Sequence, residues 1–189
     1  MSKRKKYTVL ISTLFFFLVV ITTFLTKKEI MFSSNMKKGI EKYWKNKVVI
    51  KEVKDFEAYG KKFRIVLSVS VNNEKYKYLN CYEEKLNGLF YRSYQASEQG
   101  GSRALLNFST IHVNNVKDSN KENWITVVYG YNKDLLVDNY EMKINGHEKN
   151  IISSIKGKEY FVDVYKGSFE ELVSASGKDG SDMLNAFSD

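Results

Sequence analysis

An uncharged apolar stretch stands near the start of the chain, between two groups of basic residues. It runs from Tyr7 to Leu25, and thirteen of these nineteen residues are Leu, Ile, Val or Phe. As a helix rising ~1.5 Å per residue it would span roughly 28 Å, close to the ~30 Å hydrocarbon core of a bilayer. We therefore predict a transmembrane helix over 7–25. A cleaved signal peptide is the alternative, but such peptides have apolar regions of about 7–15 residues, and neither Thr23-Phe24-Leu25 nor Met31-Phe32-Ser33 fits a cleavage site well.

The basic residues around this stretch predict its orientation. Four of them precede it, at Lys3, Arg4, Lys5 and Lys6. Because positive charge is retained on the cytoplasmic side, the N-terminus is expected in the cytoplasm and residues 30–189 outside. The predicted location is a cell membrane crossed once, with the C-terminal domain extracytoplasmic.

A short amphipathic helix is predicted at 35–46, just after the apolar stretch. Ser33, Ser34 and Asn35 are good helix-capping residues, and Met36, Ile40, Tyr43 and Trp44 follow at helical spacing. Its apolar face could lie on the membrane surface. Packing of Trp44 against a following sheet is the more ordinary outcome.

From Val48 onward the hydrophobic period changes from that of a helix to that of a strand. Phe63, Ile65, Leu67, Val69 and Val71 alternate with residues of the other face, which is typical of a half-buried strand. Turn signals divide the chain into eight predicted strands: Val48–Phe56, Phe63–Val71, Tyr76–Tyr82, Leu89–Tyr94, Leu105–Val113, Trp124–Tyr131, Asn139–Asn145 and Glu159–Lys166. The first four are expected in meander order. The predicted fold is mainly β, an antiparallel β-sandwich or partly closed barrel of about eight strands.

Three further segments complete this prediction. Residues 95–102 are interpreted as a loop, and the strands at 139–145 and 159–166 as a hairpin with a long connection. Ser168 and Glu171 have capping-box spacing, so 167–189 is predicted to be a short helix and a polar tail. The chain thus divides into a basic flank and anchor (1–28), a juxtamembrane helix (29–47), an extracytoplasmic β-domain (48–166) and the tail (167–189).

The distribution of charge along the chain argues against a nucleic-acid partner. The net charge is +8, but six basic residues flank the apolar stretch, which leaves 24 basic against 22 acidic residues. Within 29–64 there are ten Lys or Arg against five Asp or Glu. This excess would be attracted to anionic headgroups or wall polymers, although a solvated lysine-rich surface explains it as well.

No motif in the sequence names a reaction, so no catalytic, cofactor-binding or metal-binding residue is predicted. His112 and His147 lack the spacing of metal or catalytic histidines, and Cys81 has no activating partner nearby and is expected to pack in the core. Asp118 to Glu122 departs from a calcium-binding loop, and an oxygen-ligand site at Asp179 to Asp182 is only weakly indicated. The Ser-x-x-Lys matches at Ser34 and Ser153 lack an accompanying Lys-Thr-Gly.

Three tyrosines share one face of a predicted strand and form the candidate binding face. They are Tyr76, Tyr78 and Tyr82. Aromatic rings with hydroxyls suit a glycan or peptide. Ordinary packing of a sheet face is the alternative, since strands favour tyrosine in any case.

The layout of the chain resembles that of uncharacterised small single-anchor membrane proteins of low-GC Gram-positive bacteria. The resemblance lies in the basic start, the apolar stretch, the capped helix and the strand string at 125–132 followed by Lys143-Ile144-Asn145-Gly146. It implies a membrane location without enzymatic activity and assigns no site residues. We therefore predict a membrane-anchored interaction module of the cell envelope that binds an envelope protein or wall polymer. The alternative is an envelope enzyme that uses scattered Asp and Glu residues.

Overall fold

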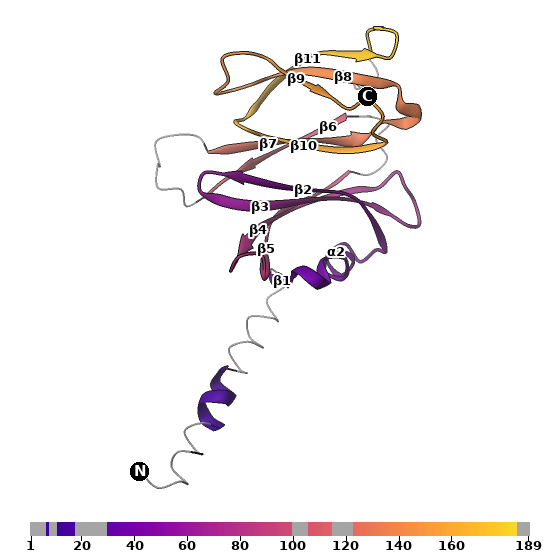
Figure 1. The fold of residues 1–189 in the computed structure, drawn as a ribbon. Helices are drawn as coiled ribbons and strands as arrows, with labels where there is room; N and C mark the ends of the chain where they lie inside the picture. The colour runs from indigo at the N-terminus through magenta and orange to yellow at the C-terminus, as the bar shows by residue number, and fades with distance from the viewer. Residues whose placement is uncertain (1–6, 8–10, 18–29, 100–105, 115–122, 185–189) are drawn as a thin grey trace.

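Three antiparallel sheets make up the folded body in the computed structural model (Figure 1), which describes residues 7, 11–17, 30–99, 106–114 and 123–184. The helix-side sheet has the strand order β1-β5-β4-β3-β2, the central sheet β10-β7-β6 and the distal sheet β11-β8-β9. The strands are β1 (Ile30–Phe32), β2 (Val48–Ala58), β3 (Lys61–Ser70), β4 (Lys77–Lys85), β5 (Phe90–Gln99), β6 (Leu106–His112), β7 (Trp124–Tyr131), β8 (Val137–Ile144), β9 (Ile151–Ser154), β10 (Tyr160–Lys166) and β11 (Phe169–Gly177). Helix α2 (Met36–Trp44) and the 3₁₀ turns η1 (Ser33–Asn35) and η2 (Lys133–Leu135) connect them. The predicted mainly β, antiparallel class is confirmed.

The elements are stacked in four layers: α2, the helix-side sheet, the central sheet and the distal sheet (Figure 1). A separate apolar cluster fills each of the three gaps. The first cluster contains Met36 and Ile40 of α2 together with Tyr82, and the second contains residues of the helix-side and central sheets. The third contains residues of the central and distal sheets. The sequence did not decide between a sandwich and a partly closed barrel. The structure is instead a stack of three sheets.

Strands β2 to β5 form the predicted meander, each paired with its neighbour in the chain. On β3, Phe63, Ile65 and Leu67 point into the cluster shared with the central sheet. Val66, between them, lies in the cluster under α2. Strand β3 was predicted to be half-buried, but both of its faces are covered.

The central sheet is apolar on both faces. Its middle strand β7 occupies the predicted range, and six consecutive residues of it are buried. Ile125 and Val127 face the helix-side sheet, whereas Val128 faces the distal sheet. A continuous run of apolar residues is the expected pattern for a strand that is covered on both sides.

The predicted hairpin between 139–145 and 159–166 is wrong. Strand β8 pairs with β9 and β11, whereas β10 pairs with β7 in another sheet. The long connection contains β9, which supplies the antiparallel partner that β8 needed. At four residues, β9 was too short to give an alternating signal.

The short helix predicted at the start of 167–189 is also wrong, because 169–177 form β11. The pairing of β11 with β8 shifts register at three points. Each shift breaks the period-two alternation, so the sequence hides the strand. Asn145 holds Ser168 in place: its backbone N–H donates to the carbonyl oxygen of Ser168 at 2.9 Å and its Nδ2 to the hydroxyl at 3.1 Å. Residues 185–189 lie outside the described part of the chain.

Two further segments differ from the sequence-based expectation. Residues 95–99, interpreted as a loop, extend β5, while 100–102 lie outside the described residues. Strand β1 was not predicted. It pairs with β5 through Ile30 with Arg92 and Phe32 with Phe90, so the chain joins the edge of the helix-side sheet before α2 begins.

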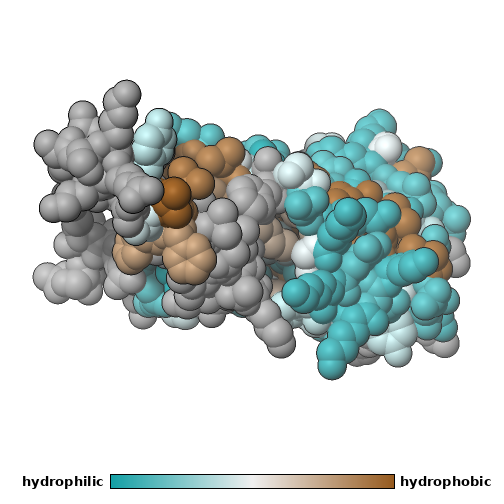
Figure 2. Space-filling model, turned by 90° about the horizontal axis from the view of Figure 1, so that it is seen from below, coloured by the Kyte–Doolittle hydropathy of each residue, from teal (hydrophilic) through white to brown (hydrophobic). Residues whose placement is uncertain are grey.

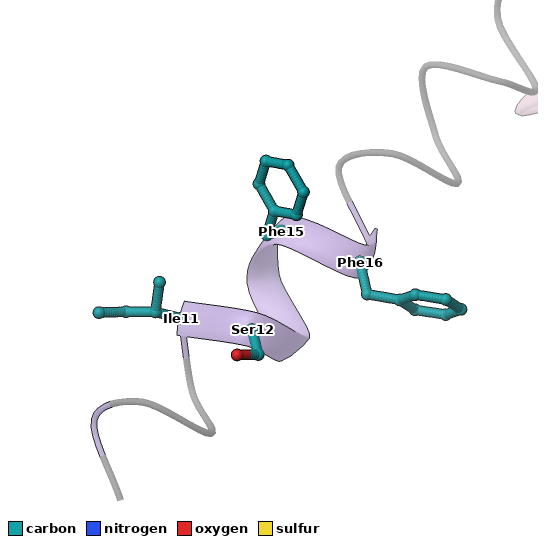
Figure 3. Close-up of a pocket in the computed structure, with 4 residues that line it drawn as sticks. All are labelled: Ile11, Ser12, Phe15 and Phe16. Atoms are coloured by element: carbon teal, nitrogen blue, oxygen red, sulfur yellow. The ribbon is translucent and has the colours of Figure 1, made fainter. Parts of the chain in front are cut away.

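The predicted transmembrane segment lies largely outside the described residues. The described part, 11–17, is helical, and Ile11, Leu14, Phe15, Phe16 and Phe17 are 62–68% exposed. Figure 3 shows Ile11, Phe15 and Phe16 projecting outward from this helical stretch. Among the residues that the structure describes, no helix has both the length and the apolar character needed to cross a membrane.

The stacked core gives a stability prediction. Leu67 is fully buried between the helix-side and central sheets, whereas Leu136 is 46% exposed. Leu67→Ala should lower the free energy of unfolding by about 2–5 kcal/mol, because it removes buried methyl groups and leaves a cavity. Leu136→Ala, the matched control, should change it by about 0.5 kcal/mol or less. Urea unfolding followed by circular dichroism measures both, and equal stabilities of the two variants would contradict the assignment of Leu67 to the core.

Candidate functional site

The three tyrosines of the candidate binding face do not share one environment. Tyr78 and Tyr82 are each 3% exposed and lie beneath α2, whereas Tyr76 precedes β4 and is 39% exposed. Burial raises the pKa of the Tyr82 hydroxyl. Leu79 and Cys81 point to the opposite face, into the cluster shared with the central sheet. Two of the three rings therefore form the seat of a helix, and their role in binding a partner stays a prediction.

Helix α2 is fixed to this seat by specific contacts as well as by burial. The ring of Trp44 stacks on that of Tyr78 with centroids 4.8 Å apart, and its Nε1 donates to Oδ1 of Asn80 at 3.0 Å. Just after the helix, Asn46 Nδ2 donates to the Tyr78 hydroxyl at 2.9 Å and to the Ser70 hydroxyl at 3.0 Å. The predicted packing of Trp44 against the sheet is confirmed, and the orientation of α2 on the body is fixed by side-chain hydrogen bonds.

The other side of α2 is strongly basic. Residues 36–47 contain five lysines and one glutamate. Lys37 lies 4.0 Å from Glu41, whose carboxylate also accepts from the Val48 backbone N–H at 3.3 Å. Lys38 and Lys42, four residues apart and thus on one helical side, lie opposite the buried Ile40. We call the exposed residues Lys38, Lys42, Lys45 and Lys47 the α2 lysine face; within the described part of the chain they pair with no carboxylate.

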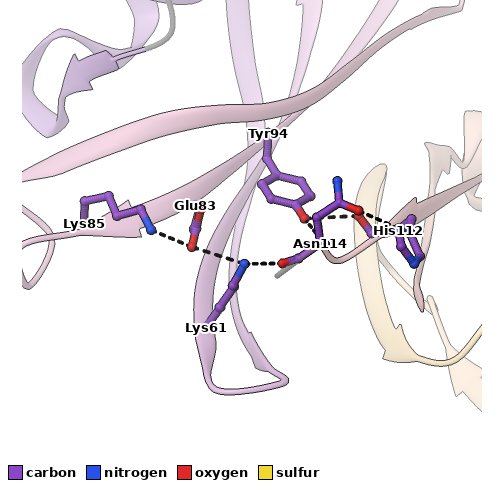
Figure 4. Close-up of polar contacts among 6 residues, drawn as sticks. All are labelled: Lys61, Glu83, Lys85, Tyr94, His112 and Asn114. Carbon is purple, nitrogen blue, oxygen red and sulfur yellow. Dashed lines mark hydrogen bonds and ion pairs between the residues drawn. The ribbon is translucent and has the colours of Figure 1, made fainter. Parts of the chain in front are cut away.

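A second polar cluster lies where the helix-side and central sheets meet (Figure 4). Glu83 is 6% exposed, and its carboxylate lies 2.6 Å from Nζ of Lys85 and 3.8 Å from Nζ of Lys61. Lys61 also donates to the backbone oxygen of Asn114 at 2.5 Å. Two ammonium groups thus compensate the charge of the buried Glu83 carboxylate, which is therefore not an unpaired base. The hydrogen bond from Lys61 to Asn114 joins the two sheets.

The same cluster continues to a tyrosine and a histidine. The Tyr94 hydroxyl donates to the backbone oxygen of His112 at 3.1 Å and accepts from the Asn114 N–H at 2.6 Å. Nδ1 of His112 lies 2.8 Å from Oδ1 of Asn114, and its ring tilts against Trp124. Burial raises the pKa of Tyr94. His112 therefore ends a strand with local partners, and His147, whose Nε2 lies 2.8 Å from the backbone oxygen of Lys166, does the same in a turn.

A buried carboxylate that has no basic partner among the described residues lies between the central and distal sheets. Oδ2 of Asp163 accepts from the Tyr140 hydroxyl at 2.8 Å and from the Ser153 hydroxyl at 3.0 Å. The Tyr165 hydroxyl lies 3.1 Å from that of Tyr140. Burial and then the charge of Asp163 raise the pKa of Tyr140. These groups come from β8, β9 and β10, so the network fixes the position of one sheet on another.

If the chain were an enzyme, the alternative function, a shallow depression at the end of β2 and β3 would be the candidate active site. Asp55, Glu57 and Glu84 line it together with Lys62. Asp55, however, accepts two hydrogen bonds of 2.7 Å from Arg64, and these lower the pKa of its carboxyl group. An acid catalyst needs a raised pKa. The use of scattered carboxylates in catalysis stays a prediction.

The remaining candidate residues have local structural roles. Cys81 is 1% exposed, and burial raises the pKa of its thiol to about 12, so it is a core residue as predicted. The Asp179 carboxylate accepts from the Ser181 N–H at 3.0 Å and that of Asp182 from the Leu184 N–H at 2.8 Å. Asp118 to Glu122 lies outside the described residues. Within those residues, no three His, Cys, Asp or Glu side chains are grouped closely enough to hold a metal ion.

Comparisons of the chain with protein-family models, with curated proteins and with solved structures returned no match.

The two environments of the tyrosines give a second stability prediction. Tyr82→Ser should lower the free energy of unfolding by about 3–5 kcal/mol, because it removes a ring that α2 covers. Tyr76→Ser should change it by less than about 1 kcal/mol, because that ring is partly in solvent. Urea unfolding of both variants tests this. If Tyr82→Ser were as stable as the parent, α2 would not be seated on Tyr82.

Proposed function

We propose that the chain is a membrane-anchored, extracytoplasmic interaction module of the cell envelope. The observation that carries this proposal is the apolar surface of residues 11–17, where five large apolar side chains are 62–68% exposed. Burying such side chains in water-free surroundings is strongly favourable, and the three clusters of the β-body are filled by its own residues. The exposed side chains of 11–17 would therefore enter a bilayer with the rest of the stretch 7–25, and the β-body would fold outside it. The partner would be an envelope protein or a wall polymer.

The distal sheet is the surface best placed to meet such a partner. In the order of layers it is farthest from α2, which follows the anchor closely in the chain (Figure 1). Its outer face carries Ile152, 73% exposed, beside Glu141, with which Ile152 pairs across the strands. Val173, 38% exposed, lies on β11, on the other side of β8. Apolar side chains among polar groups, on a sheet facing away from the membrane, suit the binding of a partner.

The location can be tested with introduced cysteines, since Cys81 is too buried to react. Lys149→Cys places a thiol in an exposed turn of the distal sheet, and Ser2→Cys places one before the apolar stretch. In intact cells a membrane-impermeant maleimide should label Lys149→Cys, and Ser2→Cys only after permeabilisation. The reverse labelling would overturn the orientation. Recovery of the protein in the soluble fraction would overturn the anchor.

Binding can be tested by site-specific photo-crosslinking in the same cells. A photoreactive residue in place of Ile152 should give adducts of defined size with an envelope protein, or adducts that disappear when the wall is digested. The matched control is the same residue in place of Val71, which is 54% exposed in the turn after β3 on the helix-side sheet. Equal adducts from both positions, or none from Ile152, would contradict binding through the distal sheet.

A further inference from the structure

Two leucines stand in solvent in the turn between β4 and β5. Leu86 is 72% exposed and Leu89 is 56% exposed. The backbone of Leu86, Asn87 and Gly88 is left-handed, with φ of 49°, 54° and 83°, and the Leu89 N–H donates to the Leu86 oxygen at 3.3 Å. Gly and Asn adopt this conformation readily, whereas leucine does so at a cost. Leu86 is thus unfavourable both in its conformation and in its exposure to water, a combination that indicates a surface made for a contact. We call residues 86–89 the leucine turn.

The leucine turn lies close to the point where the chain arrives from the apolar stretch. Its last residue, Leu89, precedes Phe90, and Phe90 pairs with Phe32 of β1. Strand β1 begins at Ile30, so only residues 26–29 separate it from the end of the apolar stretch at Leu25. A chain of this length reaches at most about 18 Å. If the stretch enters a bilayer, the edge of the sheet that carries β1 must stay near the bilayer surface.

The α2 lysine face lies at this same end of the body. Helix α2 follows β1 after the three residues of η1, and Gly39 of the helix approaches the Met31 side chain of β1 so closely that a Cβ on Gly39 would clash with it. Seen from the side of α2, the surface over the folded body shows mostly hydrophilic residues, many with long projecting side chains (Figure 2). Lys38, Lys42 and Lys45 are exposed here without a carboxylate partner in the described chain.

We propose that this end of the body lies on the surface of the membrane that holds the apolar stretch. The leucine turn enters the interfacial layer of the bilayer, and the α2 lysine face binds its anionic headgroups. Apolar side chains flanked by lysines are the composition that binds such surfaces, and each lysine near an anionic bilayer adds attraction that salt weakens. The proposal rests on the proposed anchoring, since only the short connection from Leu25 selects a lipid surface as the occupant. A second copy of the chain is the competing occupant.

The full chain, reconstituted in vesicles, tests this directly. Leu89→Cys is labelled with a fluorophore that responds to polarity, and Lys149→Cys carries the same label as a control at the distal sheet. Vesicles contain phosphatidylcholine alone or with about one third phosphatidylglycerol. We expect the label at 89 to shift to shorter wavelength and to be quenched by lipids that carry a quencher near the headgroup, more strongly with phosphatidylglycerol and less in high salt. The label at 149 should remain at its value in water.

Variants with matched loss of charge test the role of the lysines. Lys38→Gln, Lys42→Gln and Lys45→Gln combined should reduce the response at 89 in phosphatidylglycerol vesicles at least threefold. The control combines Lys149→Gln, Lys158→Gln and Lys178→Gln, three exposed lysines near the distal sheet, in the same labelled protein, and should leave the response unchanged. Leu86→Ser should reduce the response in both kinds of vesicle. All these side chains are exposed, and circular dichroism checks that each variant folds.

The outcomes separate this inference from the proposed anchoring. If the protein floats with the vesicles but the label at 89 keeps its value in water, the membrane-facing surface is wrong and the anchor stands. A response that depends on the ratio of protein to lipid, without quenching by lipid, would show a second copy on the surface and would also overturn the inference. Failure to float with any vesicle would overturn both.

Discussion

The central sheet carries apolar side chains on both faces, and its three strands need a cover on each side. Ile125 and Val127 require the helix-side sheet, while Val128 and Phe161 require the distal sheet. A single sheet exposes one face to water without cost only when that face is polar. This two-sided burial makes the stack of three sheets necessary, because removing either outer sheet would expose a contiguous apolar surface. The outer face of the helix-side sheet also carries apolar side chains, and α2 covers part of that face.

The two gaps between the sheets are filled in chemically different ways. The cluster between the helix-side and central sheets is built from aliphatic and aromatic groups, whose contacts fix no single register. The gap between the central and distal sheets also holds the network of Asp163, Tyr140, Ser153 and Tyr165. Because a buried carboxylate is stable only when its hydrogen bonds are made, this network permits one relative position of the two sheets. At the edge of the first gap, the hydrogen bonds from Lys61 to the Asn114 backbone oxygen and from the Tyr94 hydroxyl to the His112 backbone oxygen have the same effect.

Sequence pattern predicted the elements better than their partners. The strands at 48–56, 63–71 and 124–131, the meander and the helix at 35–46 follow from periodicity, which is a local property. The predicted partner of β8 was wrong because β9 is short and β11 is bulged, so neither strand showed a regular alternation. The surroundings of the tyrosines could not be predicted for another reason: alternation places Tyr78 and Tyr82 on one face, but only the position of α2 shows that this face is covered. The leucine turn carried a readable signal in Asn87-Gly88, yet the strand predicted after it began at Leu89, whereas β5 begins at Phe90 and leaves Leu89 exposed in the turn.

Rigid docking decides what the α2 lysine face can do. A basic helix on a loose connection would satisfy its charges by moving to any anionic surface, with no effect on the body. Here Trp44 and Asn46 bind the end of α2 to Asn80, Tyr78 and Ser70, and the seat lies within the same sheet that carries the leucine turn. An attraction that acts on the lysines therefore acts on the whole stack of layers. Under the proposed anchoring, it would hold the helix-side sheet toward the bilayer and the distal sheet away from it. On this proposal, the short connection after Leu25 would limit the distance of the body from the membrane, and the lysines and leucines would determine which side of the body faces that membrane.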